Sequence, residues 1–521
     1  MTTTHGLAGR REWTGLAVLL LPTLVIAMDM GILFFAVPFI STELRPSGTE
    51  QLWIMDIYSF LLAGLLIPMG AIGDRIGRRR LLMAGAAGFA AASVLAATSD
   101  GAGQLIAARA LLGITGATLM PSTLALIRNM FHDPKQRQAA MGAWGAAMMA
   151  GATLGPVAGG LLLDHFTWSA VFLAAVPVMV LVLLTAPLLL PEYRAPKSGR
   201  FDLPGALLSA AAVLPAVYGV KHLAVEGWST GALLALLAGA LLGAALVWRL
   251  RTAATPLVDL GLFRNRTFSG AVVVNTVTML AMMGFTLYTS QYLQLVRGMA
   301  PLTASLWALL PSVGVFATVG ASGALADRVR PGVRLAGGLV VAAAGFAIMT
   351  QVQPGSPLAL ILTGAGVLAA GTVASMMLTA ELVVSAAPPE EAGAASAVSE
   401  TATELGGSLG IALLGAAGAA VYSARLDDTL PAGLPADLAE VARDTLGGAV
   451  TVAGQLPDGL GGQLLTAARE AFTDGMHLAA VVGLLTMLLG AFLAHRMLGD
   501  LPVPAHTPET AEDGARQSEL V

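Results

Sequence analysis

The sequence predicts an all-α polytopic membrane protein, and three observations lead to this fold class. Hydrophobic residues make up 56% of the 521 residues and charged residues only 12%, well below the charged fraction of soluble domains. Apolar runs of roughly 18 residues or more recur along the chain, long enough for a helix to cross a bilayer. Basic residues gather in alternate connections between these runs, as they do on the cytoplasmic side of membranes.

Fourteen apolar runs are candidate transmembrane helices. They lie near residues 16–40, 52–73, 81–98, 104–128, 138–163, 169–190, 205–224, 230–248, 268–295, 302–326, 333–352, 357–386, 393–422 and 476–497. The runs 205–224 and 230–248 contain no acid and fall in the middle of the chain. We therefore expect two six-helix bundles, in residues 1–190 and 267–500, separated by two inserted helices in 191–266. Residues 501–521 are polar and are expected to form a disordered cytoplasmic tail.

The distribution of basic residues predicts the orientation in the membrane. With the N-terminus in the cytoplasm, alternation places 21 of the 28 basic residues inside and six outside. Both termini are therefore expected in the cytoplasm of a bacterial inner membrane. The segment 424–474 carries eight acids and three bases and falls outside. It is either a solvated spacer or an acidic cap that covers the exit or attracts cations.

Acidic residues within the apolar runs are the strongest functional signal. Glu400 and Glu404 are one helical turn apart, and no basic residue occurs from 392 to 421. A carboxylate at the centre of a membrane helix costs about 2.5–3.5 kcal/mol, so it is rare there without a function. The pair therefore indicates a proton or cation site rather than the solvated face of a soluble helix. Glu381 either joins this set or reaches water at the cytoplasmic end of its run.

Two further acids lie in the first two runs, and neither has a basic neighbour in sequence. Asp29 lies near the middle of its run, at the depth where transporters bind substrates, and we expect it to anchor a cation. In the competing account, Asp29 pairs with Arg109 of the fourth run and is purely structural. Asp56 lies one turn into the second run, and it either joins the acid set or reaches the outer interface.

Glycine-rich motifs mark two other places. The loop after the second run reads GAIGDRIGRRR (70–80), and a related stretch, GALADRVR (323–330), follows the tenth run. Similar loops in two halves argue for an internal repeat and for alternating access between the halves. The residues expected to act in this conformational change are Gly70, Gly73, Asp74, Arg75, Gly77, Arg78, Asp327 and Arg328. In the fifth run, Gly151, Gly155 and Gly159 share one face around Pro156, which favours close helix packing.

These motifs resemble those of a known transporter family. Residues 70–80 are similar to the signature loop between helices two and three of the major facilitator superfamily. Residues 151–160 resemble the antiporter signature of its drug exporters, and Arg109 resembles the helix-four arginine tied to proton coupling, although Leu112 replaces the usual Gln. Together with the acids and the long loop before the last span, they make the chain resemble the fourteen-helix drug:H⁺ antiporters. These QacA-like proteins export quaternary ammonium compounds and cationic dyes.

The resemblance implies a proton-coupled multidrug exporter of lipophilic cations, which works as a monomer without a cofactor. Seven aromatic residues are candidates for its substrate cavity, although such residues more often form interfacial belts or packing: Trp53, Tyr58, Trp144, Phe285, Tyr288, Tyr292 and Trp307. The alternatives are an exporter of the same fold for an endogenous metabolite, peptide or lipid, and a membrane-embedded enzyme or lipid-binding scaffold.

Several kinds of site are not expected from this sequence. The seven histidines have no metal-ligand spacing, and there are no cysteines. No phosphate-binding loop of the G-x-x-x-x-G-K-[ST] type occurs, which argues against a self-contained ATP-driven pump. We therefore expect no metal, nucleotide or nucleic acid as a partner, and no enzymatic activity.

Overall fold

The computed structural model describes residues 8–193, 202–226, 229–253, 259–311, 318, 328–388 and 392–501. These residues form helices and connecting turns, with no strand among them. The first part of the chain folds into α1 (Arg10–Leu44), α2 (Gly48–Ile76), α3 (Arg78–Ala97), α4 (Ala102–Met130), α5 (Pro134–His165), α6 (Ser169–Leu173) and α7 (Ala175–Leu189). Two helices follow, α8 (Leu203–Glu226) and α9 (Thr230–Thr252).

The second part of the chain begins with a short 3₁₀ turn, η1 (Leu262–Arg264). It continues with α10 (Arg266–Gln291), the π-helical turn η2 (Tyr292–Val296), α11 (Pro301–Trp307), α13 (Pro331–Met349), α14 (Leu358–Ser385), α15 (Ala392–Thr429), α16 (Ala436–Asp444), α17 (Leu446–Ala453) and α18 (Asp458–Leu498). Within the described residues, 11 helices are long and apolar enough to cross a membrane.

The helices agree closely with the apolar runs of the sequence. Thirteen of the fourteen predicted spans fall on helices of the structure, α6 and α7 together forming one of them. The remaining span, 302–326, begins at α11, but residues 312–317 and 319–327 lie outside the described part of the chain. The all-α polytopic fold predicted from hydropathy is confirmed. The largest difference is at the start of the last span, which was expected at 476, whereas α18 begins at Asp458.

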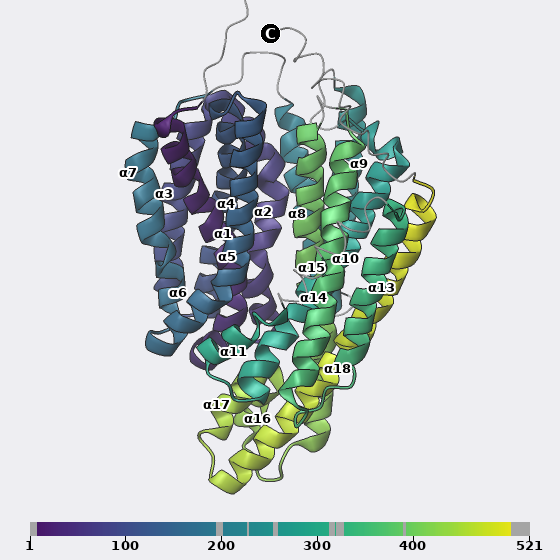
Figure 1. Cartoon of the computed structure of the whole chain (residues 1–521). Helices are drawn as coiled ribbons and strands as arrows, with labels where there is room; N and C mark the ends of the chain where they lie inside the picture. Colours follow the sequence, from purple (N-terminus) through teal and green to yellow (C-terminus); the bar gives the residue numbers. More distant parts are fainter. Residues whose placement is uncertain are drawn as a thin grey trace, which may run out of the picture.

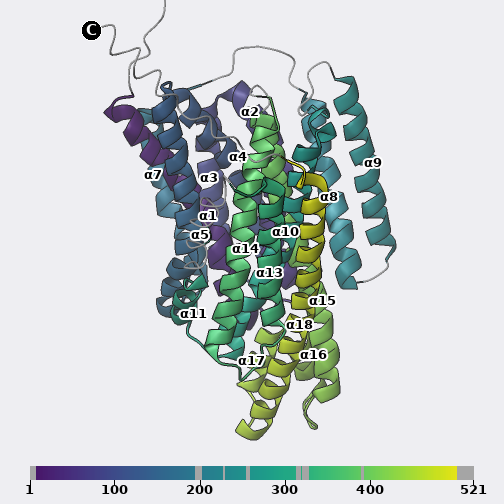
Figure 2. The same ribbon diagram turned by 45° about the vertical axis from the view of Figure 1, so that its right-hand side comes forward.

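The helices pack into two groups that lie side by side (Figure 1). Helices α1–α7 form one group, in which α1 packs on α5, and α4 packs on α2 and α3. Helices α10, α13, α14, α15 and α18 form the other group, in which α10 packs on α15 and α13 packs on α14 and α18. The pair α8–α9 lies at the edge in Figure 2, and α8 contacts both α2 and α15.

The two groups meet along α2 and α15 and along α1 and α10. At the end where α16 and α17 lie, at the bottom of Figure 1, further contacts join them. The Ser290 hydroxyl of α10 donates a hydrogen bond to the Phe34 carbonyl of α1, with 2.9 Å between the oxygens. In addition, α11 packs on α5, and α17 packs on α1. These contacts close the space between the groups at this end.

Candidate functional site

A buried ion pair joins α4 to α1 at the centre of the first group. Arg109 Nη1 lies 2.6 Å from Asp29 Oδ2, and only 1% of the arginine side chain is exposed. Arg109 Nε also donates to the carbonyl oxygen of Ile54, 3.2 Å away, and the guanidinium carbon lies 4.7 Å from the centre of the Tyr58 ring. These partners compensate a charge that would otherwise be very costly to bury. The structure thus pairs Asp29 with Arg109, as the account that gives Asp29 a purely structural role requires.

The glycine face of α5 sets the position of Asp29. A Cβ atom at Gly155 would lie 2.8 Å from the carbonyl oxygen of Met28, and one at Gly151 would lie 2.6 Å from that of Leu24. At Gly159 the nearest atom would be a side-chain carbon of Ile32, at 3.1 Å. The three glycines therefore share one face, as their spacing predicted, and this face lies against α1, with Pro156 between them within α5. Because α5 can approach so closely, α1 places Asp29 towards α4.

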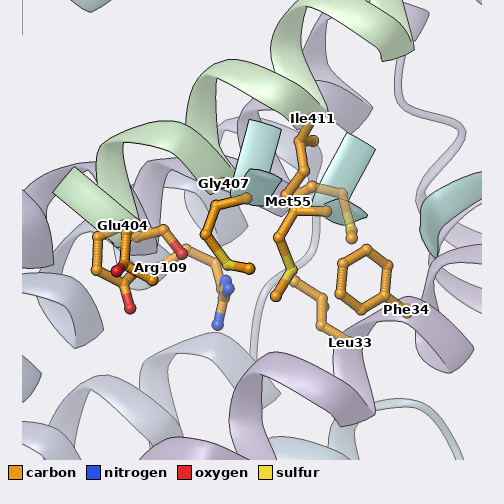
Figure 3. A pocket seen from close by; sticks show the side chains of 11 residues that line it. Leu33, Phe34, Met55, Arg109, Glu404, Gly407 and Ile411 are labelled. Carbon is orange, nitrogen blue, oxygen red and sulfur yellow. The ribbon is translucent and has the colours of Figure 1, made fainter. Parts of the chain in front are cut away.

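A cavity lies between the two groups, next to this ion pair (Figure 3). Five helices line it: α1, α2, α4, α10 and α15. Its walls are Leu33, Phe34, Met55, Ser59, Arg109, Met279, Met283, Thr403, Glu404, Gly407 and Ile411. Most of this surface is apolar, with three methionines and one phenylalanine, and the charged members are Arg109 and Glu404. The volume of about 60 Å³ holds water but no drug-sized molecule, so a substrate requires the helix groups to separate.

Glu404 is the acid that faces this cavity. It is 9% exposed and lies against the hydroxyl of Ser59 on α2. Within the described residues, no basic side chain forms an ion pair with Glu404 or with Glu400 one turn earlier. The neighbouring Thr403 accepts a hydrogen bond of 2.6 Å from the Asn275 amide of α10, which steadies this turn of α15. The two helix groups thus contribute one arginine and one carboxylate to the lining of the same cavity.

The other predicted acids lie elsewhere. Asp56 is completely buried in α2 but does not line the cavity. Glu381 is exposed near the C-terminal end of α14 and also lies away from it. Across the described residues, no three or more His, Cys, Asp or Glu side chains come together as a metal site.

The aromatic residues predicted for the cavity do not line it in this conformation. The Arg109 guanidinium lies over the ring of Tyr58. Tyr288 donates a hydrogen bond to the carbonyl oxygen of Leu414, and Tyr292 donates one to that of Gln353. The remaining four pack elsewhere: Phe285 on Phe346, Trp53 on Tyr218, Trp144 through a hydrogen bond to Thr123, and Trp307 at a partly exposed site.

The signature loop between α2 and α3 docks on the end of α7. Gly77 has φ +113°, and a Cβ there would overlap the carboxylate of Glu192. This carboxylate accepts a hydrogen bond of 3.2 Å from the backbone N–H of Arg79 and lies 3.6 Å from its side-chain Nε. Arg78 reaches the carbonyl oxygen of Pro121 on α4, at 3.5 Å. Gly77 is thus required both for its backbone conformation and for the approach of Glu192.

Not all of the predicted loop residues are described. Gly70 and Gly73 lie in the last turns of α2, and Arg75 is exposed there, but the side chain of Asp74 lies outside the described residues. In the second copy of the motif, Arg328 is exposed, whereas Asp327 also falls outside the described part. The structure therefore shows the contacts of the first loop, and the role of both loops in the conformational change stays a prediction.

Sequence reasoning missed several residues that the structure places in or near the site. Phe34, Met279 and Met283 line the cavity, yet within an apolar span they look like any packing residue. Glu192 gave no signal of its own because its role depends on the loop that docks against it. Glycine spacing would have revealed one more feature: Gly406 on α15 faces the Thr276 carbonyl of α10, at 2.5 Å from a built Cβ. Helices α10 and α15 therefore pack as closely as α1 and α5.

Solved structures of similar fold are transporters. A bacterial homologue of the human lysosomal transporter Spinster, in an inward-facing and unoccupied conformation, superposes with a TM-score of 0.67 and 16% identity, covering 95% of this chain and 99% of that one. The peptide transporter POT in complex with sulfate superposes with a TM-score of 0.63 and 16% identity, covering 93% and 95%. At these identities, the likeness concerns the fold alone.

Curated relatives are much closer in sequence. The multidrug efflux pump LfrA of Mycolicibacterium smegmatis is 44% identical over 482 residues, which cover 92% of this chain and 95% of that protein. The methyl viologen resistance protein SmvA of Salmonella typhimurium is 36% identical, with coverages of 89% and 93%. The tetracenomycin C resistance and export protein of Streptomyces glaucescens is 33% identical over 97% of both chains. The model of the Major Facilitator Superfamily matches residues 19–411. The chain therefore belongs to the major facilitator superfamily, and it is a multi-pass membrane transporter, not an enzyme.

Proposed function

We propose that this protein is a proton-coupled exporter of lipophilic cations, such as quaternary ammonium compounds and dyes. The observation that carries the proposal is Glu404, a buried carboxylate with no ion-pair partner among the described residues, set in a methionine-rich cavity between the two helix groups. A carboxylate in such a place gains from any cation that neutralises it, whether a proton or a substrate. The relatives named as multidrug and methyl viologen resistance proteins support the choice of substrate class.

In this proposal, substrate and proton compete for the same carboxylate. A cation that enters from the cytoplasm displaces the proton of Glu404, and the two helix groups then rock to open the other end. After the cation has left, a proton from outside neutralises the carboxylate and permits the return. Methionine side chains adapt to substrates of different shape, which suits a multidrug cavity.

Asp29 and Glu400 are secondary acids in the same proposal. Asp29 is neutralised by Arg109 in this conformation, so it becomes available to a cation only when that pair separates. Glu400 lies one turn from Glu404, where it adds negative potential. Asp56 and Glu381 are weaker candidates for cation binding, because neither lines the cavity. The contacts of Arg109 would change with the state of the site, because Arg109 donates a hydrogen bond to Asp29 and also lines the cavity.

We also propose the orientation and organisation that follow from the sequence. Both termini lie in the cytoplasm of a bacterial inner membrane, and α16 and α17 lie outside. Residues 1–190 and 267–500 form two six-helix bundles, 191–266 contributes two inserted helices, and one chain suffices for transport. The packing of α1–α7 and of α10–α18 into separate groups supports this division.

Purified protein in liposomes tests the function. With a pH-sensitive dye inside and ethidium as substrate, an outward-directed substrate flux should move protons in the opposite direction. The variant Glu404→Gln should lose both fluxes by tenfold or more. Ethidium transport that is independent of the proton gradient would overturn the coupling, and undiminished transport by Glu404→Gln would overturn the assignment of the site.

A further inference from the structure

Three of the five helices that line the central cavity also line a second cavity. Helices α2, α10 and α15 line both cavities. Along α2, Met55 lines the first cavity and Leu52 the second, and along α15, Ile411 lines the first and Gly415 the second, so the two cavities are about one helical turn apart. The second cavity is closed on its far side by the α16–α17 hairpin and by α18. It therefore lies between the central cavity and the end of the molecule that we place outside the membrane.

Negative charge accumulates at the mouth of this second cavity. Asp444, the last residue of α16, lines it and is exposed to solvent on one side. Partial burial, together with the carboxylates of Glu440 on α16 and Glu50 on α2, raises the pKa of Asp444. Glu50 itself is held in place, because its carboxylate accepts a hydrogen bond of 2.9 Å from the Ser47 backbone N–H.

Two nearby basic residues, Arg443 of α16 and Arg425 of α15, pair with other carboxylates. Arg443 pairs with Asp427, and Arg425 pairs with Asp474 at 3.2 Å. From α15, the titratable group that faces Asp444 is the phenol of Tyr422, which is uncharged at neutral pH. The cavity mouth thus carries an excess of negative charge that a cation would relieve.

Inside the cavity, the side-chain amide of Gln291 is a polar group that a ligand can contact. Gln291 on α10 is 6% exposed and lines the cavity, and within the described residues its amide has no hydrogen-bond partner. The amide can therefore donate and accept hydrogen bonds with a molecule that enters the cavity. This observation is independent of the carboxylates at the mouth.

Three aromatic rings, those of Tyr288, Tyr422 and Phe472, also line the cavity. The Tyr288 hydroxyl donates to the Leu414 carbonyl at 2.8 Å, and the Tyr422 hydroxyl donates to the Ala442 carbonyl at 2.7 Å. The ring of Phe472 lies 5.7 Å from that of Tyr288. Aromatic faces held in this way beside a carboxylate attract organic cations.

The cavity is now small, at about 50 Å³, but its walls belong to both helix groups. Gln51 and Leu52 come from α2, whereas Tyr288, Gln291 and Asp444 come from the second group and its hairpin. Separation of the groups at this end therefore enlarges it. We propose that this cavity is an outer binding site for the transported cation, in which Asp444 supplies the charge partner and Gln291 a buried polar contact. The inference rests on the proposed function and adds a second, weaker site on the exit path.

Equilibrium binding of tetraphenylphosphonium to the full-length protein in nanodiscs tests the proposal. At pH 8 the wild type should bind two cations per chain, one tightly and one weakly. Asp444→Asn and Gln291→Leu should each weaken only the second component, by tenfold or more, while Glu404→Gln should weaken only the first. Asp437→Asn is the matched control, because it removes an exposed acid from the first turn of α16, away from the cavity. It should leave both components unchanged.

The pH dependence gives a second readout. Cation binding needs the ionised carboxylate, so the weak component of the wild type should fade as the pH falls through the raised pKa of Asp444. A single bound cation per wild-type chain, or a weak component that survives both Asp444→Asn and Gln291→Leu, would overturn the outer site and leave the proposed function standing. Tight binding that is insensitive to Glu404→Gln would instead count against the proposed function, while loss of the weak component would still support the outer site.

Discussion

Arg109 and Asp29 are 80 residues apart in sequence, yet the guanidinium Nη1 lies 2.6 Å from the carboxylate Oδ2. The arginine is the more deeply buried partner, with 1% of its side chain exposed against 13% for the aspartate. Removing the aspartate therefore leaves a buried cation, whereas removing both charges leaves no ion to bury. This asymmetry separates a structural role of the pair from a substrate-binding role.

The first prediction is that Asp29→Asn lowers stability and that Arg109→Leu restores part of it in the same chain. Breaking a buried pair typically costs about 3–5 kcal/mol, much of it from the orphaned charge. Thermal unfolding in detergent of the two single variants and the double variant measures the effect. A stable Asp29→Asn protein that binds monovalent cations more weakly would favour direct anchoring of the substrate by Asp29 instead.

The second prediction concerns the two glutamates of α15. Glu404 lines the central cavity and Glu400 does not, so Glu404→Gln should reduce ethidium efflux at least tenfold and Glu400→Gln less. If the acids act as one site, the double variant should be no worse than Glu404→Gln alone. Efflux from inverted vesicles, normalised to the amount of folded protein, provides the measurement. Additive losses would mean that each acid works separately.

Much of this fold could be predicted from the sequence because hydropathy acts locally. A helix must satisfy its own backbone groups in lipid, so each apolar run reports a helix without reference to its neighbours. The face of Gly151, Gly155 and Gly159 was predictable for the same reason, since spacing within one helix fixes which residues point together. In the structure, this glycine face packs closely on α1.

The central cavity could be predicted only in part, because it depends on how separate helices are rotated. The acids were visible in the sequence, since charge is costly in a membrane. Their partners were not: pairing of Asp29 with Arg109, and the absence of a comparable ion pair for Glu404 among the described residues, follow from the packing of α1, α4 and α15. None of the seven aromatic candidates lines the central cavity in this conformation, in which Phe34 and three methionines line the space while Tyr288 bonds across to α15.

The third prediction tests the orientation. The chain has no cysteine of its own, so single cysteines can be read without background. Arg80 at the start of α3 and Asp437 in α16 are both exposed, and they lie at opposite ends of the helix groups. On intact cells, a membrane-impermeant thiol reagent should label Asp437→Cys and spare Arg80→Cys until the cells are opened. Labelling of Arg80→Cys alone would invert the proposed topology.

The fourth prediction concerns the contact between α5 and α1. A methyl group at Gly155 would lie 2.8 Å from the Met28 carbonyl oxygen, which is backbone and cannot turn aside, so Gly155→Ala should push α1 away. Overpacking of this kind costs about 1–3 kcal/mol. Because Met28 precedes Asp29, the displacement should also weaken the contact with Arg109 and reduce transport.

Gly145 on the same helix is the matched control for this prediction, because a Cβ there would meet no atom within 4 Å. Gly145→Ala should be neutral or slightly stabilising, since alanine forms helices better than glycine by up to about 1 kcal/mol. Unfolding temperature and ethidium efflux, measured for both variants, should therefore fall for Gly155→Ala alone. Equal behaviour of the two would show that α1 can shift without consequence, and that the glycine face does not position Asp29.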